Sequence, residues 1–250
     1  METNKMRIAV AGGTGLVGRK VVEEVRRAGA TPVVIARSAG VDLTTGEGLD
    51  DALAGVDAVV DASNVETMSA ATSVAFFDAA TRHLLAAGER AGVRHHVALS
   101  IVGCDRVDLP YYLGKRRQEE LVTAGPVPWT IVRATQFHEF AGQLVDRSPG
   151  PFALAPRMLS QPVSAAEVAS LLVATALGEA RRTTLDIGGP RPERMDRLVR
   201  AELRRRGTRR VVVPLPMAGR TGRQVKDGGL LPGPGATLGE QTFDAWAAGA

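Results

Sequence analysis

The sequence predicts an α/β protein built on a doubly wound parallel sheet with a small C-terminal region. Three observations support this fold class. Short apolar runs alternate with segments in which apolar residues recur at helical spacing. A glycine-rich stretch lies directly between the first apolar run and the first helical segment. Together with the next apolar run they form a βαβ unit of roughly 30 residues, the usual size of such a crossover.

Five short strands are expected in the first half of the chain. Their residues are 8–10, 32–36, 58–62, 96–100 and 129–133. Helices are expected between them, around residues 17–25, 45–53, 69–91 and 111–124. Right-handed crossovers would bring the carboxyl ends of all strands to one edge of the sheet, which is where ligands of open α/β sheets bind.

The regular alternation weakens after the fifth strand. Residues 135–140 and the proline-punctuated residues 148–156 read as irregular segments that shape a pocket. A helix at 165–177, a strand at 184–187 and a basic helix within 191–210 are expected to follow. We therefore expect one domain over residues 1–250, with a dinucleotide-binding core mainly in 1–134 and a substrate-binding region mainly in 135–250.

The composition excludes several classes of protein. A lone Cys104 forms no internal disulfide, and with only four scattered histidines a zinc site is not expected. No apolar run approaches the ~18 residues that a membrane span requires, and no signal-peptide pattern is visible. We therefore expect a cytoplasmic protein with neither a metal nor a membrane partner.

Positive charge is concentrated in residues 191–210, which carry nine arginines and three acidic residues. Apolar residues from Met195 to Leu203 fall on one helical face there, which leaves the arginines on the solvent side. We favour a solvated basic helix packed on the body of the protein, and binding to a polyanion or an acidic partner is the alternative. Nucleic acid is thus not an expected partner, whereas homo-oligomerisation stays open.

The glycine-rich stretch at residues 11–18 predicts a phosphate-binding turn. Strand, turn and helix in this order present backbone N–H groups and the positive end of a helix to a pyrophosphate. Two registers fit the spacing, one using Gly12, Gly15 and Gly18 and the other starting at Gly13. Either register predicts that the chain binds a dinucleotide.

Arg37 lies 19 positions after Gly18, where NAD-binding folds place an acidic residue about 20 positions past the glycines. A carboxylate there accepts hydrogen bonds from the ribose 2′-hydroxyl, whereas a guanidinium pairs with a 2′-phosphate. Ser38 follows directly. The residue type therefore favours NADP(H) over NAD(H).

Tyr111, Lys115 and Ser100 carry candidate catalytic chemistry. Tyr111 and Lys115 are four residues apart on an expected helix, so the hydroxyl and the ammonium group lie on one face. A nearby cation favours phenolate and would lower the pKa of the tyrosine from its usual ~10. Ser100 closes the fourth strand, where its hydroxyl would polarise a substrate carbonyl.

Three residues after the fifth strand are expected to line the substrate pocket. Phe137 and Phe140 lie close together in a chain with only 4% aromatic residues, which favours an apolar pocket. His138 lies between them and is either a wall residue or an acid or base that faces the substrate.

Several motifs resemble those of atypical short-chain dehydrogenase/reductase proteins, close to the NAD(P)H-binding, NmrA-like group. They lie at residues 12–18, 37–38, 41–43, 95–100, 111–115, 128–133 and 161–169. The resemblance implies a Rossmann-type fold with NADP(H) across the strand ends, and it favours the register that starts at Gly12. The residues it implies around the cofactor are Gly12, Thr14, Gly15, Leu16, Val17, Gly18, Arg37, Ser38, Asp42, Leu43, Ala62, Ser63, Asn64 and Lys115.

These observations favour an NADPH-dependent oxidoreductase. It would transfer hydride between the cofactor and a carbonyl or conjugated double bond of a small, partly apolar metabolite. Tyr111 would give the proton, Lys115 would hold the nicotinamide ribose and Ser100 would orient the substrate oxygen. Two alternatives remain open, namely a non-catalytic NmrA-like redox sensor that binds NADP(H), and an epimerase or dehydratase that retains its cofactor.

Overall fold

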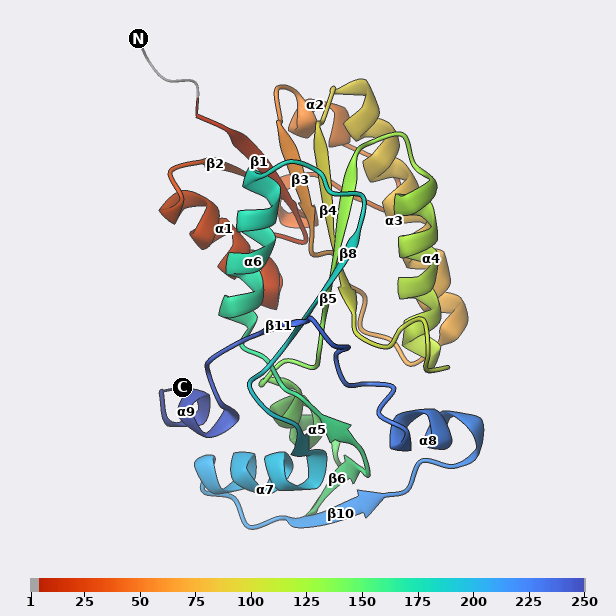
Figure 1. Cartoon of the computed structure of the whole chain (residues 1–250), viewed down its shortest axis with the longest axis vertical. Coiled ribbons are helices and arrows are strands. Elements are labelled where there is room, and N and C mark those ends of the chain that lie inside the picture. The colour runs from red at the N-terminus through yellow and green to blue at the C-terminus, as the bar shows by residue number, and fades with distance from the viewer. Residues whose placement is uncertain (1–4, 250) are drawn as a thin grey trace. The chain divides into compact units, whose positions relative to one another are not determined.

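The central feature of the computed structural model, which describes residues 5–249, is a seven-stranded sheet (Figure 1). Its strand order is β11-β8-β5-β4-β3-β1-β2, and β1 pairs in parallel with both β2 and β3. The five expected strands are all present, and β8 and β11 extend the sheet. The strands are β1 (Arg7–Ala11), β2 (Thr31–Ile35), β3 (Ala58–Asp61), β4 (His95–Ile101), β5 (Trp129–Ala134), β8 (Thr184–Gly188) and β11 (Thr237–Leu238).

Helices cover both faces of this sheet. In Figure 1 α1 and α6 lie on one side and α3 and α4 on the other. The predicted doubly wound parallel fold is therefore confirmed. No helix among residues 5–249 has the length and apolar character needed to cross a bilayer. The helices are α1 (Leu16–Arg27), α2 (Leu49–Leu53), α3 (Ala70–Arg90), α4 (Pro110–Ala124) and α6 (Ala165–Leu177), with a short 3₁₀ turn η1 (Arg37–Ala39) after β2.

The strand order reverses between β1 and β3, because the chain first adds β2 on one side of β1 and then returns to add β3 on the other. In doubly wound sheets with this 2-1-3 order, ligands bind in the crevice beyond the carboxyl ends of the two strands at the reversal. Here those ends are Ala11 and Asp61, which are register partners. The fold therefore brings the glycine-rich turn next to residues 62–64.

The chain divides into two compact units, and both are discontinuous in sequence. The first contains the residues up to Ser100 together with Pro110–Arg133 and Ala165–Leu185, and the second contains Ile101–Leu109, Ala134–Ser164 and the residues from Asp186 on. This grouping differs from the expected boundary near residue 134. The reason is that α6 packs against α1, while the N–H of Ile131 donates to the carbonyl of Thr183 at 3.1 Å.

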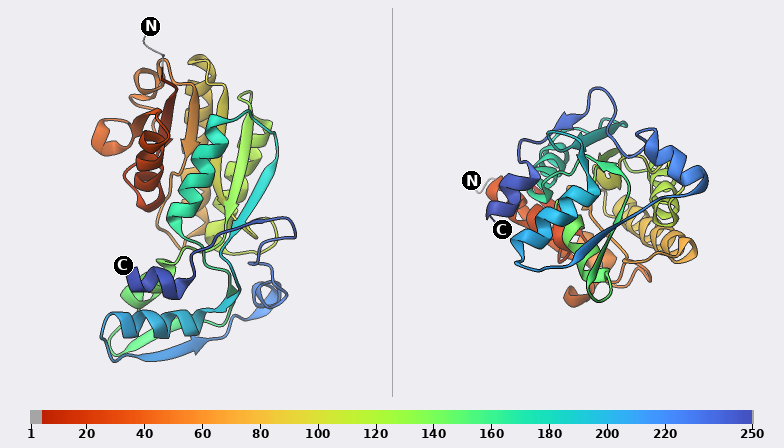
Figure 2. Two further views of the ribbon diagram at one scale, coloured as in Figure 1. Left: turned by 60° about the vertical axis from the view of Figure 1, so that its left-hand side comes forward. Right: turned by 90° about the horizontal axis from the view of Figure 1, so that it is seen from below.

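The second unit has its own core, formed by α5, α7, α9 and the β6–β10 ribbon (Figure 2). Apolar residues of α7, including Met195 and Leu203, pack against Ala153 and Ala155 of β6. The sequence did not predict α5, α8 or the short strands of this unit. Its elements are α5 (Phe140–Arg147), β6 (Phe152–Pro156), β7 (Leu159–Ser160), β9 (Glu193–Arg194), α7 (Met195–Arg205), β10 (Val211–Leu215), α8 (Gly219–Lys226) and α9 (Phe243–Gly249).

Candidate cofactor site and catalytic residues

The glycine-rich turn leaves no space for side chains at two of its glycines. Gly12 has a φ of +71°, and a Cβ atom there would lie 2.8 Å from the carbonyl oxygen of Ala62. A Cβ atom at Gly18 would lie 2.0 Å from the carbonyl oxygen of Gly12. Both positions therefore require glycine, one because the turn packs on the end of β3 and one because α1 packs on the turn.

The first turn of α1 is suited to an anion. The residue before the helix is Gly15, which provides no side-chain cap, and the first turn carries no acidic residue. The first N–H groups of a helix lack intrahelical partners and attract negative charge. Arg19 adds a cation at this place and donates to the carbonyl of Thr14 at 3.0 Å. The sequence analysis did not predict a role for Arg19, although a basic residue directly after Gly18 could have suggested one.

The exposed pair Arg37 and Ser38 forms the first two residues of η1, directly after β2. Asp42 follows in a turn that it stabilises itself, since its carboxylate accepts the N–H of Thr44 at 2.7 Å and the Thr44 hydroxyl at 2.6 Å. These bonds, and to a lesser degree the charge of Arg37, hold the pKa of Asp42 below its usual value. The carboxylate of Asp42 is thus a turn former, and Leu43 packs on the core with its carbonyl 3.0 Å from Nδ1 of His83.

Residues 62–64 follow β3, and Ala62 and Ser63 lie against the glycine-rich turn. The N–H of Ser63 donates to the Asp61 carboxylate at 3.0 Å, while the buried Ser63 hydroxyl has no hydrogen-bond partner among the described residues. An orphaned buried hydroxyl next to the glycine-rich turn is a group that a bound ligand would satisfy. The turn, the uncapped helix end and this hydroxyl together fit a dinucleotide.

Tyr111 is the second residue of α4, and its hydroxyl donates to Oδ1 of Asn64. The structure contradicts the expectation that a cation lowers the pKa of Tyr111. Burial, followed by the nearby Tyr112 and Asp61, raises this pKa well above its usual value. Tyr111 is therefore a neutral phenol at physiological pH in this state.

The ammonium group of Lys115 is buried against β4 and α3. It donates to the carbonyl of Leu99 and to Oε1 of Gln118, both at 2.9 Å, and it lies 4.2 Å from the ring centroid of Phe77. Ser100, the residue after Leu99, is buried at the end of β4. The structure therefore joins Lys115 to the strand that carries Ser100, which spacing alone did not reveal.

Gly114 sets the distance between α4 and α3. A Cβ atom there would lie 2.2 Å from the Ser73 hydroxyl oxygen and 2.7 Å from Cδ2 of Phe77. The Ser73 hydroxyl donates to the carbonyl of Tyr111 at 2.9 Å, and the rings of Phe77 and Tyr111 meet edge to face at 5.9 Å. The close approach of the two helices thus places both Tyr111 and Lys115.

The expected substrate-pocket residues all lie in the second unit. His138 is buried, with Nε2 3.1 Å from the carbonyl oxygen of Gln241 and with the rings of Phe243 and Trp246 packed on it. Phe140 packs on the core of this unit. The wall-residue interpretation of His138 fits these contacts better than a role as acid or base.

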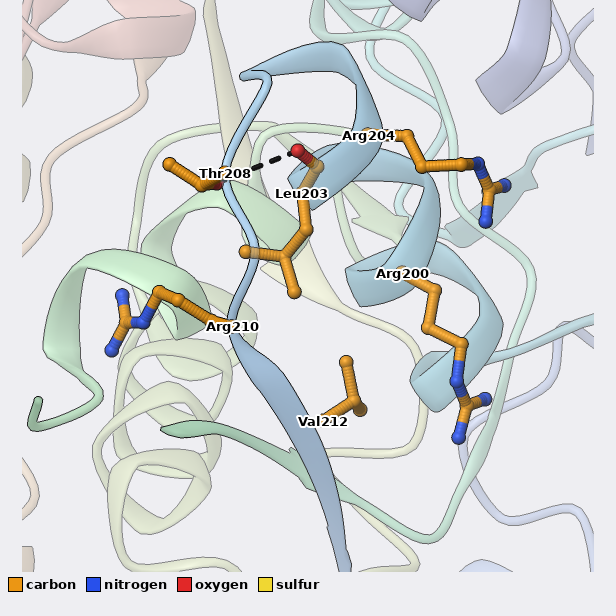
Figure 3. A pocket seen from close by; sticks show the side chains of 6 residues that line it. All are labelled: Arg200, Leu203, Arg204, Thr208, Arg210 and Val212. Carbon is orange, nitrogen blue, oxygen red and sulfur yellow. Dashed lines mark hydrogen bonds between the residues drawn. The ribbon is translucent and has the colours of Figure 1, made fainter. Parts of the chain in front are cut away.

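Several arginines of the basic segment form ion pairs with its three acidic residues, although the segment keeps a net positive charge. Arg205 and Arg206 both pair with the buried Glu202, and Arg200 pairs with Asp196. A cavity of about 270 Å³ is lined by Arg200, Arg204 and Arg210, among others (Figure 3). Arg210 donates to the carbonyls of Val145, Ser148 and Phe152. Arg200 and Arg210 of this cavity bond within the unit, and we assign no cofactor or polyanion to it.

The fold and the turn define a dinucleotide-binding α/β protein. The chain belongs to the NAD(P)H-binding family, whose model matches residues 12–178. A solved structure of a short-chain dehydrogenase/reductase superfamily protein from Agrobacterium tumefaciens with bound NAD is similar in fold. Its TM-score is 0.69 at 22% identity, over 97% of this chain and 95% of that one.

Two curated relatives match part of the chain. It is 34% identical over 144 residues to a (4-alkanoyl-5-oxo-2,5-dihydrofuran-3-yl)methyl phosphate reductase of Streptomyces griseus, covering 52% of this chain and 48% of that protein. It is 27% identical over 147 residues to the photosystem II assembly factor Ycf39 of Synechocystis, covering 53% and 45%. The match thus spans about half the length of these relatives.

Proposed function

We propose that this protein is an NADPH-dependent reductase acting on a carbonyl or conjugated double bond of a small, partly apolar metabolite. The observation that carries the proposal is that one helix bears both Tyr111 and Lys115, and that Lys115 bonds to the strand end that bears Ser100. The reductase among the relatives acts on a furan-type ring with an alkanoyl group, which supports this substrate class.

The residues around the turn support NADPH as the cofactor. The exposed guanidinium of Arg37 and the hydroxyl of Ser38 would hold the 2′-phosphate, and the first turn of α1 would hold the pyrophosphate. Asp42 is the first acidic residue after Arg37, and its carboxylate accepts hydrogen bonds from Thr44. When bound, NADPH would supply the hydride.

The residues of the chain would supply and steer the proton. Tyr111, held as a neutral phenol by its raised pKa, has the proton to give to the substrate oxygen or carbon. Ser100 would donate a hydrogen bond to a substrate carbonyl and so stabilise developing negative charge. A phenol with a raised pKa releases its proton reluctantly, so bound cofactor and substrate would have to lower the pKa of Tyr111 during the reaction.

The test is the variant Tyr111→Phe. It removes the hydroxyl and leaves the ring packed on Phe77, so NADPH binding should be retained while turnover falls by about 100-fold or more. NADPH affinity is measured by fluorescence titration, and turnover by the loss of NADPH absorbance with a panel of enones and ketones. Unchanged turnover would remove Tyr111 from the mechanism.

A second function deserves the same assay, because the raised pKa of Tyr111 suits a protein that binds the cofactor without consuming it. The assembly factor among the relatives also favours a regulatory role. A redox sensor of this type would bind NADP and NADPH with different affinities and would oxidise no NADPH with any substrate of the panel.

A further inference from the structure

Three buried polar side chains link α4 to the end of β3 in the first unit. Lys115 donates to Oε1 of Gln118 at 2.9 Å, and Nε2 of Gln118 donates to Oδ2 of Asp61 at 2.8 Å. Lys115, Gln118 and Asp61 are 4%, 0% and 1% exposed, so water does not weaken the hydrogen bonds between them. Its far end is fixed because Oδ1 of Asp61 accepts the N–H of Ser63.

The orientation of the Gln118 amide is set by its two neighbours. An ammonium group only donates and a carboxylate only accepts, so the amide oxygen must face Lys115 and the amide nitrogen must face Asp61. Bonds of this kind, between an amide and a charged group, are stronger than those between neutral groups. Gln118 therefore transmits the position of Asp61 to Lys115.

The chain of contacts ends at two parts of the proposed site. At one end, Lys115 also donates to the carbonyl of Leu99, directly before Ser100. At the other end, Ser63 packs on the glycine-rich turn, within 2.9 Å of where a Cβ atom of Gly12 would lie. Gln118 joins these two ends, so a shift of Asp61 or Ser63 at the glycine-rich turn would shift the ammonium group of Lys115.

We propose that Gln118 is a positioning residue that, anchored on Asp61, holds the ammonium group of Lys115 in place for the nicotinamide ribose and for Tyr111. This inference rests on the proposed function. It adds two residues that the tyrosine–lysine motif does not include, and it assigns them a role through Lys115 rather than contact with substrate.

The experiment is a double-mutant cycle on Gln118→Leu and Asp61→Asn. If Gln118 acts through its anchor on Asp61, we expect Gln118→Leu to lower kcat and to weaken NADPH binding by about 10-fold. The double variant should then be no worse than Gln118→Leu within about twofold, because the two residues work as one unit. Gln161→Leu is the matched control, since it removes a buried glutamine that donates to Gly189 at 2.7 Å in the other unit.

A second readout follows Lys115 without turnover. Amine-reactive labelling with mass spectrometry should show Lys115 protected in the wild type and at least several-fold more reactive in Gln118→Leu. Gln118→Glu keeps an acceptor for the ammonium group but loses the donor to Asp61, so Lys115 should still be more reactive than in the wild type. Full wild-type protection in this variant would show that the anchor on Asp61 is not needed. Thermal unfolding of each variant reports any loss that is purely structural.

The outcomes separate the two proposals. If Tyr111→Phe abolishes turnover but Gln118→Leu keeps the wild-type kcat, NADPH affinity and Lys115 protection, the positioning role is overturned and the reductase stands. Additive effects of Asp61→Asn and Gln118→Leu would also overturn it. If the wild type oxidises no NADPH but Lys115 labelling and NADPH affinity depend on Gln118, the reductase fails and the positioning role stands.

Discussion

Substituting Gly114 by alanine tests how closely α4 must approach α3. The new Cβ atom would meet the Ser73 hydroxyl oxygen at 2.2 Å, the Ser73 carbonyl oxygen at 2.7 Å and the Phe77 ring at 2.7 Å. Such overpacking costs about 1–3 kcal/mol, and three contacts below 3.0 Å place this case at the upper end. Alanine regains up to about 1 kcal/mol of helix propensity. The free energy of unfolding should fall by about 2 kcal/mol.

A loss of this size lowers the Tm of a chain of this length by roughly 4–8 °C. Circular dichroism melting of Gly114→Ala and of Gly88→Ala measures it. Gly88 is the matched control, because it also lies in a long helix of the first unit but a Cβ atom there would meet its nearest neighbour only at 3.7 Å. Gly88→Ala should melt at the wild-type temperature or above. A Tm of Gly114→Ala at or above that of the wild type would refute the reasoning.

Three further predictions concern charge. Arg37→Glu should weaken NADPH binding at least 10-fold by charge repulsion and leave NADH binding unchanged, and equal losses for both in titrations would contradict the assignment. Arg133→Met breaks a mostly buried two-bond ion pair with Glu119 and should lower the free energy of unfolding by about 3 kcal/mol in urea, whereas a loss under 1 kcal/mol would show a weak pair. Burial lowers the pKa of both His95 and His96, so protons bind the unfolded chain first. Urea stability should therefore fall as the pH drops below about 6.5, and a flat profile would contradict this.

The sheet of the first unit could be predicted because its signals are local. Each strand is a short apolar run, and the buried residues Val17, Val21 and Val25 of α1 recur at helical spacing. The handedness of the crossovers predicted that the carboxyl ends of the strands share one edge of the sheet. Residues 62–64 were expected at the cofactor only from the family resemblance.

The second unit could not be predicted in the same way, because its pairings are distant in sequence. Phe152 of β6 pairs with Val211 of β10, and no local pattern records such a partner. The helix α5 has eight residues, too few for a clear period next to the prolines that follow it. Tertiary contacts therefore decide structure here.

The candidate catalytic residues show the same limit, because their chemistry depends on contacts that are distant in sequence. Spacing placed Tyr111 and Lys115 on one helical face, but a pKa depends on surroundings that spacing does not reveal. The Lys115 ammonium group is drawn to Leu99, Gln118 and the Phe77 ring, and burial dominates at Tyr111. The expected lowering of the Tyr111 pKa was wrong for this reason.

The discontinuous first unit has a consequence for synthesis on the ribosome. Its β5 strand ends near Arg133, yet α6 and the residues that bond to β5 lie at 165–185. At about 5–20 residues per second, translation needs roughly 3–10 s to add the ~50 residues in between. Throughout that interval the surface of α1 that α6 later covers is exposed on the nascent chain. During this interval a chaperone that binds apolar surface can bind the uncovered surface of α1. Once α6 packs on α1, that surface is no longer accessible.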